Sequence, residues 1–202
     1  MFCRMAILKI ARLGHPVLYR RADPVEDPRA PALRRLIADM IETLEDAGGV
    51  GLAAPQVHVP LRVFLYRVPE QRASHGEGAQ PLSVVINPEI VARSAEAEPG
   101  WEGCLSIPGF SALVTRPVRI VLRGTDAAGE AFSRPAAGFH ARVIQHEADH
   151  LDGILYPSRL ADPRAMGFSE EMGRYGDELV GSLQLAAGDE TAVGAVRVGA
   201  GR

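Results

Sequence analysis

Apolar residues recur at helical spacing between residues 27 and 49. Their positions, three or four residues apart, would form one face of a helix; they are Leu33, Leu36, Ile37, Met40, Ile41 and Leu44. Asp27 and Pro28 precede this run, and Gly48 and Gly49 follow it. Because these residue types are typical of the two ends of a helix, the pattern predicts an N-terminal helix within this segment.

Shorter apolar runs after this helix predict β-strands. The runs are bounded by turn-forming residues and cover residues 61–67, 82–87 and 118–124. A turn after the last run leads to a hairpin partner near Phe132. Residues 7–10 alternate between apolar and polar types and predict a further strand. The polar residues 68–80 predict a loop.

A second helical pattern begins at residue 135 or 136 and runs to Leu151, where Asp152 and Gly153 end it. Several strands followed by one strongly patterned helix are typical of an α+β domain. We therefore expect mixed or antiparallel β-sheets around this central helix, with the N-terminal helix packed beside them.

The length of 202 residues predicts one domain with a short appendage, since domains average about 150 residues. We expect the domain to cover residues 1–165 and a C-terminal extension to cover residues 166–202. Helical spacing near residues 169–185 favours a short third helix. The last fifteen residues are rich in glycine and alanine, which favours a mobile tail.

Charge and composition narrow the classes of partner. The net charge is −3 without a basic block, so there is little electrostatic attraction for nucleic acid. No apolar run approaches the ~18 residues that a membrane-spanning helix needs, and no secretory signal pattern opens the chain. We therefore expect a cytoplasmic protein. Its two cysteines, Cys3 and Cys104, are more typical of a reactive or metal-binding role than of a disulfide framework.

The second helix carries two histidines four residues apart, His146 and His150, with Glu147 beside the first. Residues at this spacing lie one turn apart on the same helix face, so both imidazoles can reach one cation. Glu147 can then reach a water molecule on that cation. The pattern predicts a metal site on this helix, although two half-buried histidines on an amphipathic helix are the alternative.

A catalytic metal site normally has three protein ligands and an open position for water. Glu170 lies twenty residues after His150, where some metalloproteases have their third ligand, but its neighbours resemble the first turn of an exposed helix. Cys104 is the stronger candidate because the glycine before it allows close backbone approach. A lone cysteine is also often a small buried apolar residue. A fourth protein ligand, such as Cys3 or His140, would instead close a non-catalytic site.

Three segments of the chain together resemble the peptide deformylase family: residues 49–56 (GVGLAAPQ), 102–106 (EGCLS) and 145–153 (QHEADHLDG). The likeness extends over residues 5–160, and residues 140–142 are similar to the organelle-type branch of the family. The resemblance implies a metal-dependent hydrolase that removes the formyl group from the N-terminal formylmethionine of nascent chains and releases formate.

By this resemblance, Cys104, His146 and His150 would be the ligands of one divalent metal ion. The family uses Fe²⁺, and the same ligand types also suit Zn²⁺, Ni²⁺ and Co²⁺. Two function classes stay open beside the deformylase: a hydrolase of other N-acyl groups or a metalloprotease that uses Glu170, and a non-catalytic metal-binding domain.

The resemblance also assigns the groups that act on the substrate. Glu147 would be the general base and then the general acid. Gln56 and the backbone N–H of Leu105 would stabilise the oxyanion of the tetrahedral intermediate. Arg116 would form a structural ion pair with Asp149.

The face of the second helix that carries the histidines also suggests a substrate pocket. Phe139 and Val143 lie seven and three residues before His146, so they would form an apolar wall beside the metal. With Val50 they would hold a methionine side chain, and the backbones of Gly51 and Gly103 would contact the peptide. The alternative is that these apolar residues only form core.

Two departures from the family pattern affect the expected partners. Ser111 stands where many bacterial members have an arginine that contacts the peptide, and Arg142 would either favour acidic substrates or form an ion pair. Most charged residues of the predicted third helix are acidic, namely Glu170, Glu171, Asp177 and Glu178, and only Arg174 has the opposite charge. Since these carboxylates would repel RNA phosphate, we expect weak or no affinity for the ribosome.

Overall fold

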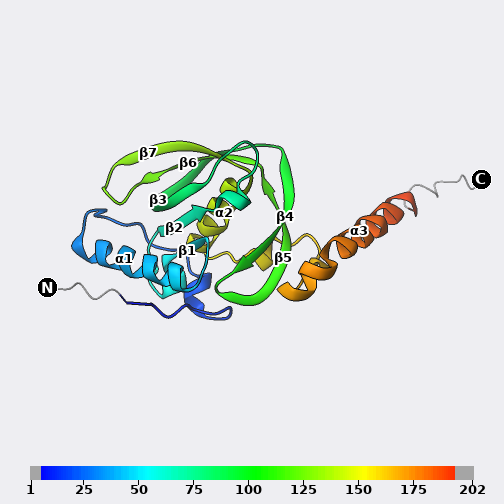
Figure 1. The fold of residues 1–202 in the computed structure, drawn as a ribbon, viewed down its shortest axis with the longest axis horizontal. Helices are drawn as coiled ribbons and strands as arrows, with labels where there is room; N and C mark the ends of the chain where they lie inside the picture. The colour runs from blue at the N-terminus through cyan, green and yellow to red at the C-terminus, as the bar shows by residue number, and fades with distance from the viewer. Residues whose placement is uncertain (1–5, 194–202) are drawn as a thin grey trace, which may run out of the picture.

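The computed structural model of the protein describes residues 6–193, with side chains described for residues 6–183 (Figure 1). Its longer helices are α1 (Pro31–Asp46), α2 (Gly138–Leu151) and α3 (Ser169–Val193). Five strands form one sheet in the order β1 (Gly51–Ala53), β2 (Val63–Val68), β3 (Gln80–Arg93), β6 (Arg119–Thr125) and β7 (Ala131–Ala137). Three strands form a second sheet in the order β4 (Ala97–Cys104), β5 (Ile107–Pro117) and β8 (Met166–Phe168).

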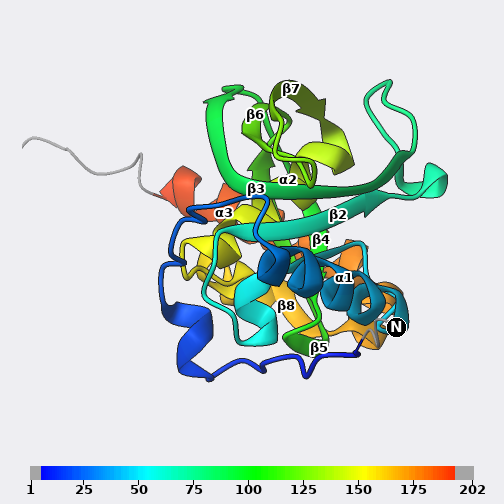
Figure 2. The same ribbon diagram turned by 90° about the vertical axis from the view of Figure 1, so that its left-hand side faces the viewer.

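Neighbouring strands in both sheets run antiparallel. Helix α2 lies between the five-stranded sheet and strands β4 and β5 (Figure 1), and in the turned view β2 and β3 lie in front of it (Figure 2). The predicted α+β architecture, with antiparallel sheets around the second helix, is therefore confirmed. This arrangement places residues of both sheets against opposite sides of one helix.

Nine of the fourteen residues of α2 are buried. Ala141, Val143 and Ile144 belong to the same apolar cluster as Phe64 and Tyr66 of β2. Burial of these side chains is the main driving force that holds the helix against the sheet. Polar residues of α2 are buried too, and each of them costs free energy unless a partner satisfies it.

The apolar face of α1 is buried as its spacing predicted. Leu33, Ile37, Met40 and Leu44 pack in a second cluster together with Leu65 and other residues of the five-stranded sheet. The helix begins at Pro31, inside the predicted segment, and its end at Asp46 brings the glycine-rich residues 48–51 to the edge of β1. This connection forms one side of the site described below.

Two sequence predictions about the N-terminus and α2 are wrong. Residues 7–10 form no strand; they run beside α1, where the Leu8 N–H donates to the Thr43 Oγ1 (2.8 Å). Helix α2 begins at Gly138 instead of residue 135 or 136. Residues 131–137 continue as β7 because they pair with β6.

The sheet of β4, β5 and β8 was not predicted. Strand β4 contains a proline and two glycines, and strand β5 contains two prolines and a glycine, so neither has the alternation of a half-buried strand. Long-range pairing between β4 and β5, in register from Ala97↔Pro117 to Gly103↔Ser111, stabilises them instead. Strand β3 likewise extends beyond its predicted end because β6 pairs with its second half.

The predicted loop at residues 68–80 caps the start of α2. The Ala137 N–H donates to the Glu77 Oε1 (2.6 Å), and the Phe139 N–H donates to the Ser74 Oγ (2.9 Å). Free N–H groups at a helix start need such acceptors. The polar loop thus fixes the end of α2 that leads to the histidines.

Helix α3 leaves the body of the domain and reaches Val193, beyond the predicted end at residue 185 (Figure 1). Residues 194–202 of the predicted tail lie outside the described residues. No helix within residues 6–193 is long and apolar enough to cross a membrane.

Candidate active site and metal centre

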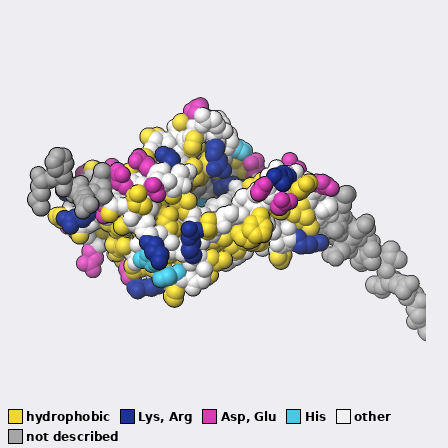
Figure 3. Space-filling model, turned by 60° about the horizontal axis from the view of Figure 1, so that its bottom comes forward, with side chains coloured by type: hydrophobic (Ala, Val, Ile, Leu, Met, Phe, Trp, Pro, Cys, Tyr) yellow, Lys and Arg dark blue, Asp and Glu magenta, His cyan; other side chains and the backbone are white. Residues whose placement is uncertain are grey.

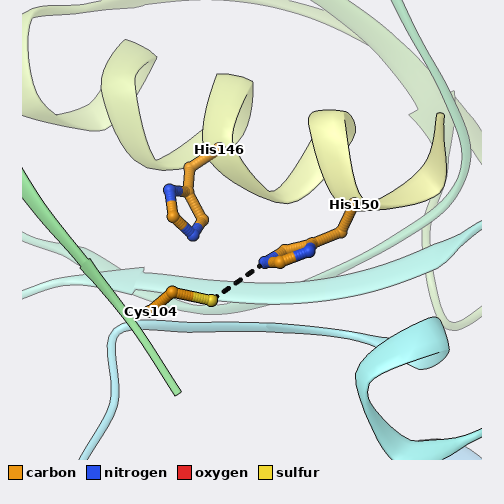
Figure 4. Close-up of side chains that lie close together, drawn as sticks. All are labelled: Cys104, His146 and His150. Atoms are coloured by element: carbon orange, nitrogen blue, oxygen red, sulfur yellow. Dashed lines mark hydrogen bonds between the residues drawn. The ribbon is translucent and has the colours of Figure 1, made fainter. Parts of the chain in front are cut away.

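Three side chains that can bind a metal converge beside α2. Cys104 lies at the end of β4, and His146 and His150 extend from successive turns of α2 toward it (Figure 4). Their potential ligand atoms all lie within 4.8 Å of one another, and the Cys104 Sγ is 3.3 Å from the His150 Nε2. The structure therefore brings together the cysteine and the two histidines that the sequence singled out.

The other candidate ligands lie elsewhere or bind other groups. Glu170 is exposed on the first turn of α3, and its carboxylate accepts a hydrogen bond from Arg174 (2.6 Å). Both ring nitrogens of His140 have hydrogen-bond partners, one of which is the Tyr66 hydroxyl at 3.1 Å. Cys3 lies outside the described residues. Neither Glu170 nor His140 belongs to the cluster of three.

Glu102 is the buried carboxylate that orients His146. It accepts two hydrogen bonds from Arg116 (2.6 and 2.9 Å), one from Arg142 (2.9 Å) and one from the His146 Nδ1 (2.8 Å). Burial alone would raise the pKa of Glu102, but Arg116 and His146 hold the pKa well below its ordinary value. Because the carboxylate occupies Nδ1, the other ring nitrogen is available to a metal.

Two arginines near the cluster have structural roles. Arg116 forms the predicted ion pair with Asp149, with 2.8 Å between the Nη1 and Oδ2 atoms. Arg142 donates to Glu102 and to backbone carbonyl groups of β4 and β5. The ion-pair alternative for Arg142 is therefore confirmed, with Glu102 as its partner. Arg142 also lines the cavity described below, and its effect on the choice of substrate stays a prediction.

The chemistry of the three donors fits a divalent transition metal. Burial on its own raises the pKa of the Cys104 thiol, but His150 and His146 outweigh burial and hold this pKa well below its ordinary value. A thiolate is the form of cysteine that binds metals. One sulfur and two imidazole nitrogens suit zinc, iron, nickel and cobalt.

Glu147 lies beside this cluster, and its carboxyl group is a weaker acid than an ordinary glutamate. Burial raises the pKa of its carboxyl group to about 7, although His146 and His150 partly oppose the rise. Its Oε2 atom is buried and has no hydrogen-bond partner among the described residues. A Cβ atom at Gly51 would lie 2.1 Å from the Glu147 Oε1, so only glycine allows the backbone of β1 to approach this carboxyl group.

Gln56 lies on the short helix η2 (Ala54–Val57) and its amide is held toward the cluster. Its Oε1 accepts from the Ala53 N–H (2.8 Å), while its Nε2 donates to the Ser106 Oγ (3.1 Å) and approaches the Cys104 Sγ (3.5 Å). The side chain is 1% exposed, so the amide cannot turn away into solvent. Leu105 follows Cys104 in the turn between β4 and β5.

A cavity of about 540 Å³ opens next to the cluster. Every residue predicted to contact substrate lines it, namely Val50, Gly51, Gly103, Phe139 and Val143. Gln56, Leu105 and Glu147 also line it, together with Cys104 and His146. The apolar wall is also part of the core, since Val143 is 5% exposed and packs against the five-stranded sheet.

Several lining residues were not found from the sequence. Trp101 precedes Glu102, so a large aromatic residue next to a matched segment was an available signal. Arg72 belongs to the polar loop, yet its guanidinium lies 3.9 Å from the centre of the Phe139 ring. Phe110 and Ser169 also line the cavity. No local pattern marks Arg72 or Ser169, because only the tertiary structure brings them to the cavity.

The sequence profile of the polypeptide deformylase family matches residues 7–166. The chain belongs to this family. Peptide deformylase 2 of Bordetella bronchiseptica is 47% identical over 161 residues, which are 80% of this chain and 92% of that protein. Peptide deformylase 2 of Ralstonia nicotianae is 46% identical over 164 residues, which are 81% of this chain and 93% of that protein.

Solved deformylase structures have the same fold. The class I type b peptide deformylase of Acinetobacter baumannii with bound Met-Ala-Ser has a TM-score of 0.72 and 34% identity, over 78% of this chain and 100% of that chain. The Ehrlichia chaffeensis peptide deformylase in complex with actinonin has a TM-score of 0.73 and 36% identity, over 78% and 91%.

Membership of the deformylase family determines the reaction. The protein is a metal-dependent hydrolase that removes the N-formyl group from the N-terminal formylmethionine of nascent polypeptides and releases formate. The cluster of Cys104, His146 and His150 is a possible site for the metal of this deformylase. The predicted family, fold and activity are confirmed.

Exchanging Glu102 for glutamine tests how the deformylase orients its histidine. We expect Glu102→Gln to lower the affinity for Co²⁺ by about 10- to 100-fold, since loss of a hydrogen-bond partner of a metal-binding histidine has effects of this size. Competition with a chelator measures this affinity. Glu98→Gln on the same strand is the control because the Glu98 side chain is half-exposed and bonds His75 instead. Equal affinities of the two variants for Co²⁺ would contradict the role of Glu102 in orienting His146.

Proposed function

We propose that Cys104, His146 and His150 bind the catalytic metal ion through the sulfur and one nitrogen of each imidazole. Their closeness, within 4.8 Å, and the lowered pKa of the thiol support this ligand set. The ion is Fe²⁺, as the family resemblance implies, although Zn²⁺, Ni²⁺ and Co²⁺ accept the same ligands. When bound, such a cation supplies Lewis acidity and lowers the pKa of water toward neutrality.

Glu147 moves the proton of the reaction. A buried carboxyl group with a pKa of about 7 can accept a proton from the attacking water near neutral pH. The water oxygen bonds to the formyl carbon, the bond from this carbon to nitrogen breaks, and Glu147 returns the proton to the leaving amine. The products are formate and a peptide with a free N-terminal methionine. The unpartnered Glu147 Oε2 supports this role.

Gln56 and Leu105 stabilise the oxyanion that forms when water attacks the formyl carbon. The Gln56 Nε2 is directed to the cluster because the Ala53 N–H holds the other end of the amide. The Leu105 N–H follows Cys104 in the chain and contributes a backbone donor. Fixed donors of this kind contribute about 10²- to 10³-fold to the rate in other hydrolases.

The methionine side chain of the substrate lies against the apolar wall of Phe139, Val143 and Val50. The backbones of Gly51 and Gly103 lie close to the peptide, since neither has a side chain that would separate backbone from substrate. All five residues line one cavity, which supports this assignment. The Acinetobacter baumannii relative was solved with Met-Ala-Ser bound, a peptide that begins with methionine.

The proposed partners of the protein are formylated nascent peptides in the cytoplasm. The first turns of α3 carry Glu170 and Glu171, which form ion pairs with Arg174 at 2.6 and 3.7 Å. Arg174 is therefore already paired with carboxylates, and the exposed carboxylates repel RNA phosphate.

For this reason the full chain should bind ribosomes weakly or not at all. We expect it to stay in the supernatant when ribosomes are sedimented at low salt, where electrostatic binding is strongest. Cosedimentation that disappears when residues 165–202 are deleted would contradict this expectation.

Exchange of the general base tests the reaction itself. Iron-loaded protein prepared without oxygen should release formate from formyl-Met-Ala, and Glu147→Gln should lower kcat by about 10²- to 10⁴-fold because the proton carrier is lost. The metal content of the variant should equal that of the wild type, since Glu147 is not a ligand. Wild-type rates in Glu147→Gln would show that another group carries the proton.

Exchange of the third ligand separates the deformylase from a metalloprotease that uses Glu170. Cys104→Ser should lose bound metal and formate release together, because serine offers no thiolate. Glu170→Gln should retain both, since Glu170 is exposed and bonds Arg174. Metal per protein, measured by atomic emission after gel filtration, gives the comparison. Loss of metal in Glu170→Gln with retention in Cys104→Ser would favour the metalloprotease.

A further inference from the structure

The cavity continues into the C-terminal segment of the chain. Phe110 of β5 and Ser169 at the start of α3 both line it. Strand β8 pairs with β5 so that Phe168 lies opposite Phe110 and Gly167 lies opposite Ser111. Residues outside the profile match of residues 7–166 therefore form part of the wall of the active-site cavity.

Two aromatic rings stand at this edge of the cavity. The ring centres of Phe110 and Phe168 are 4.5 Å apart, and the rings are tilted by 36°. Phe168 is nevertheless 62% exposed. Hydrophobic side chains gather where the body of the domain meets α3 (Figure 3). Single exposed apolar residues are common, but this exposed ring packs against Phe110, which lines the cavity.

Two hydroxyl groups lie next to these rings, one on β5 and one at the start of α3. The Ser111 Oγ and the Ser169 Oγ are 2.7 Å apart and hydrogen-bonded. Each hydroxyl has one donor and two acceptor sites, so the pair can bind a further polar group of a peptide backbone.

Close packing holds this segment against the domain. A Cβ atom at Gly176 would lie 2.6 Å from Trp101, which itself lines the cavity. Within the segment, a Cβ atom at Gly167 of β8 would lie 2.7 Å from the Met172 side chain of α3, so β8 and α3 pack closely on each other. Because the helix and β8 approach their neighbours this closely, the two aromatic rings have a defined position beside the cavity.

We propose that Phe110, Phe168 and Ser169, here called the aromatic rim, bind the third and fourth residues of the formylated peptide and favour an apolar side chain there. The inference rests on the proposed function, in which the formylmethionine occupies the cavity. A nascent polypeptide must then leave the cavity across its edge, and Phe110 and Ser169 are lining residues that adjoin the exposed ring of Phe168.

Short amidated peptides test the aromatic rim. The peptides are formyl-Met-Ala-Phe-Ser and formyl-Met-Ala-Ser-Phe, compared with formyl-Met-Ala-Ser-Ser. The wild type should have a kcat/KM about two- to tenfold higher for at least one phenylalanine peptide, which is the size of one aromatic pair. In Phe168→Ser, the ratio of kcat/KM for that phenylalanine peptide to kcat/KM for formyl-Met-Ala-Ser-Ser should fall toward one. Phe168 is exposed, so its exchange leaves the core intact.

Tyr19→Ser is the matched control. Tyr19 is an aromatic residue of similar exposure, 54% against 62% for Phe168, and does not line the cavity. Its exchange should preserve the ratio. Equal rates of the wild type for all three peptides, a ratio that survives in Phe168→Ser, or an equal loss in both variants would each overturn the aromatic rim.

Failure of the proposed function gives a different result. The wild type would then release formate from none of the peptides. Calorimetry tests the aromatic rim without turnover. It measures the binding of the deformylated peptides Met-Ala-Phe-Ser, Met-Ala-Ser-Phe and Met-Ala-Ser-Ser to the wild type and to Phe168→Ser. The aromatic rim is supported if the wild type binds a phenylalanine peptide more tightly than Met-Ala-Ser-Ser and Phe168→Ser does not. Equal binding of all three peptides to the wild type overturns it.

Discussion

The buried carboxylate of Glu102 joins the two parts of this molecule. It extends from β4 and accepts hydrogen bonds from Arg116 on β5 and from Arg142 and His146 on α2. Transfer of these charges from water costs free energy, and removal of one partner would leave the others unpaired in the interior. The network therefore tolerates little displacement of β4 relative to α2. Cys104, two residues after Glu102, is held facing the histidines for the same reason.

The site places polar groups in a largely buried part of the fold, since nine of the fourteen residues of α2 are buried. Most buried polar groups of a protein are hydrogen-bonded, and those of Glu102 and Gln56 follow this rule. The Glu147 Oε2 is an exception. Its desolvation raises the pKa of the carboxyl group to about 7, so the same burial that costs stability gives this group the acidity that the proposed proton carrier needs. Gly51 contributes by leaving room for this carboxyl group.

The C-terminal segment is part of this architecture. Strand β8 extends the sheet of β4 and β5, and Gly176 of α3 packs against Trp101. The cavity is therefore bounded by the N-terminal connection after α1, by the β4–β5 hairpin and α2, and by the start of α3. Cys104, the histidine-bearing segment of α2 and the cavity edge come from separate parts of the chain, and a rigid scaffold is what gives them one geometry.

Elements whose signals are local could be predicted from the amino-acid sequence. The apolar spacing from Leu33 to Leu44 predicted α1, and the spacing of His146 and His150 placed both rings on one face of α2. The tertiary structure alone decided that residues 7–10 form no strand, that β4, β5 and β8 form a sheet, and that Arg72 and Ser169 line the cavity. Helical spacing repeats within a few residues and can be read along the chain. Pairing between distant strands and contact across a cavity depend on partners that neighbouring residues do not specify.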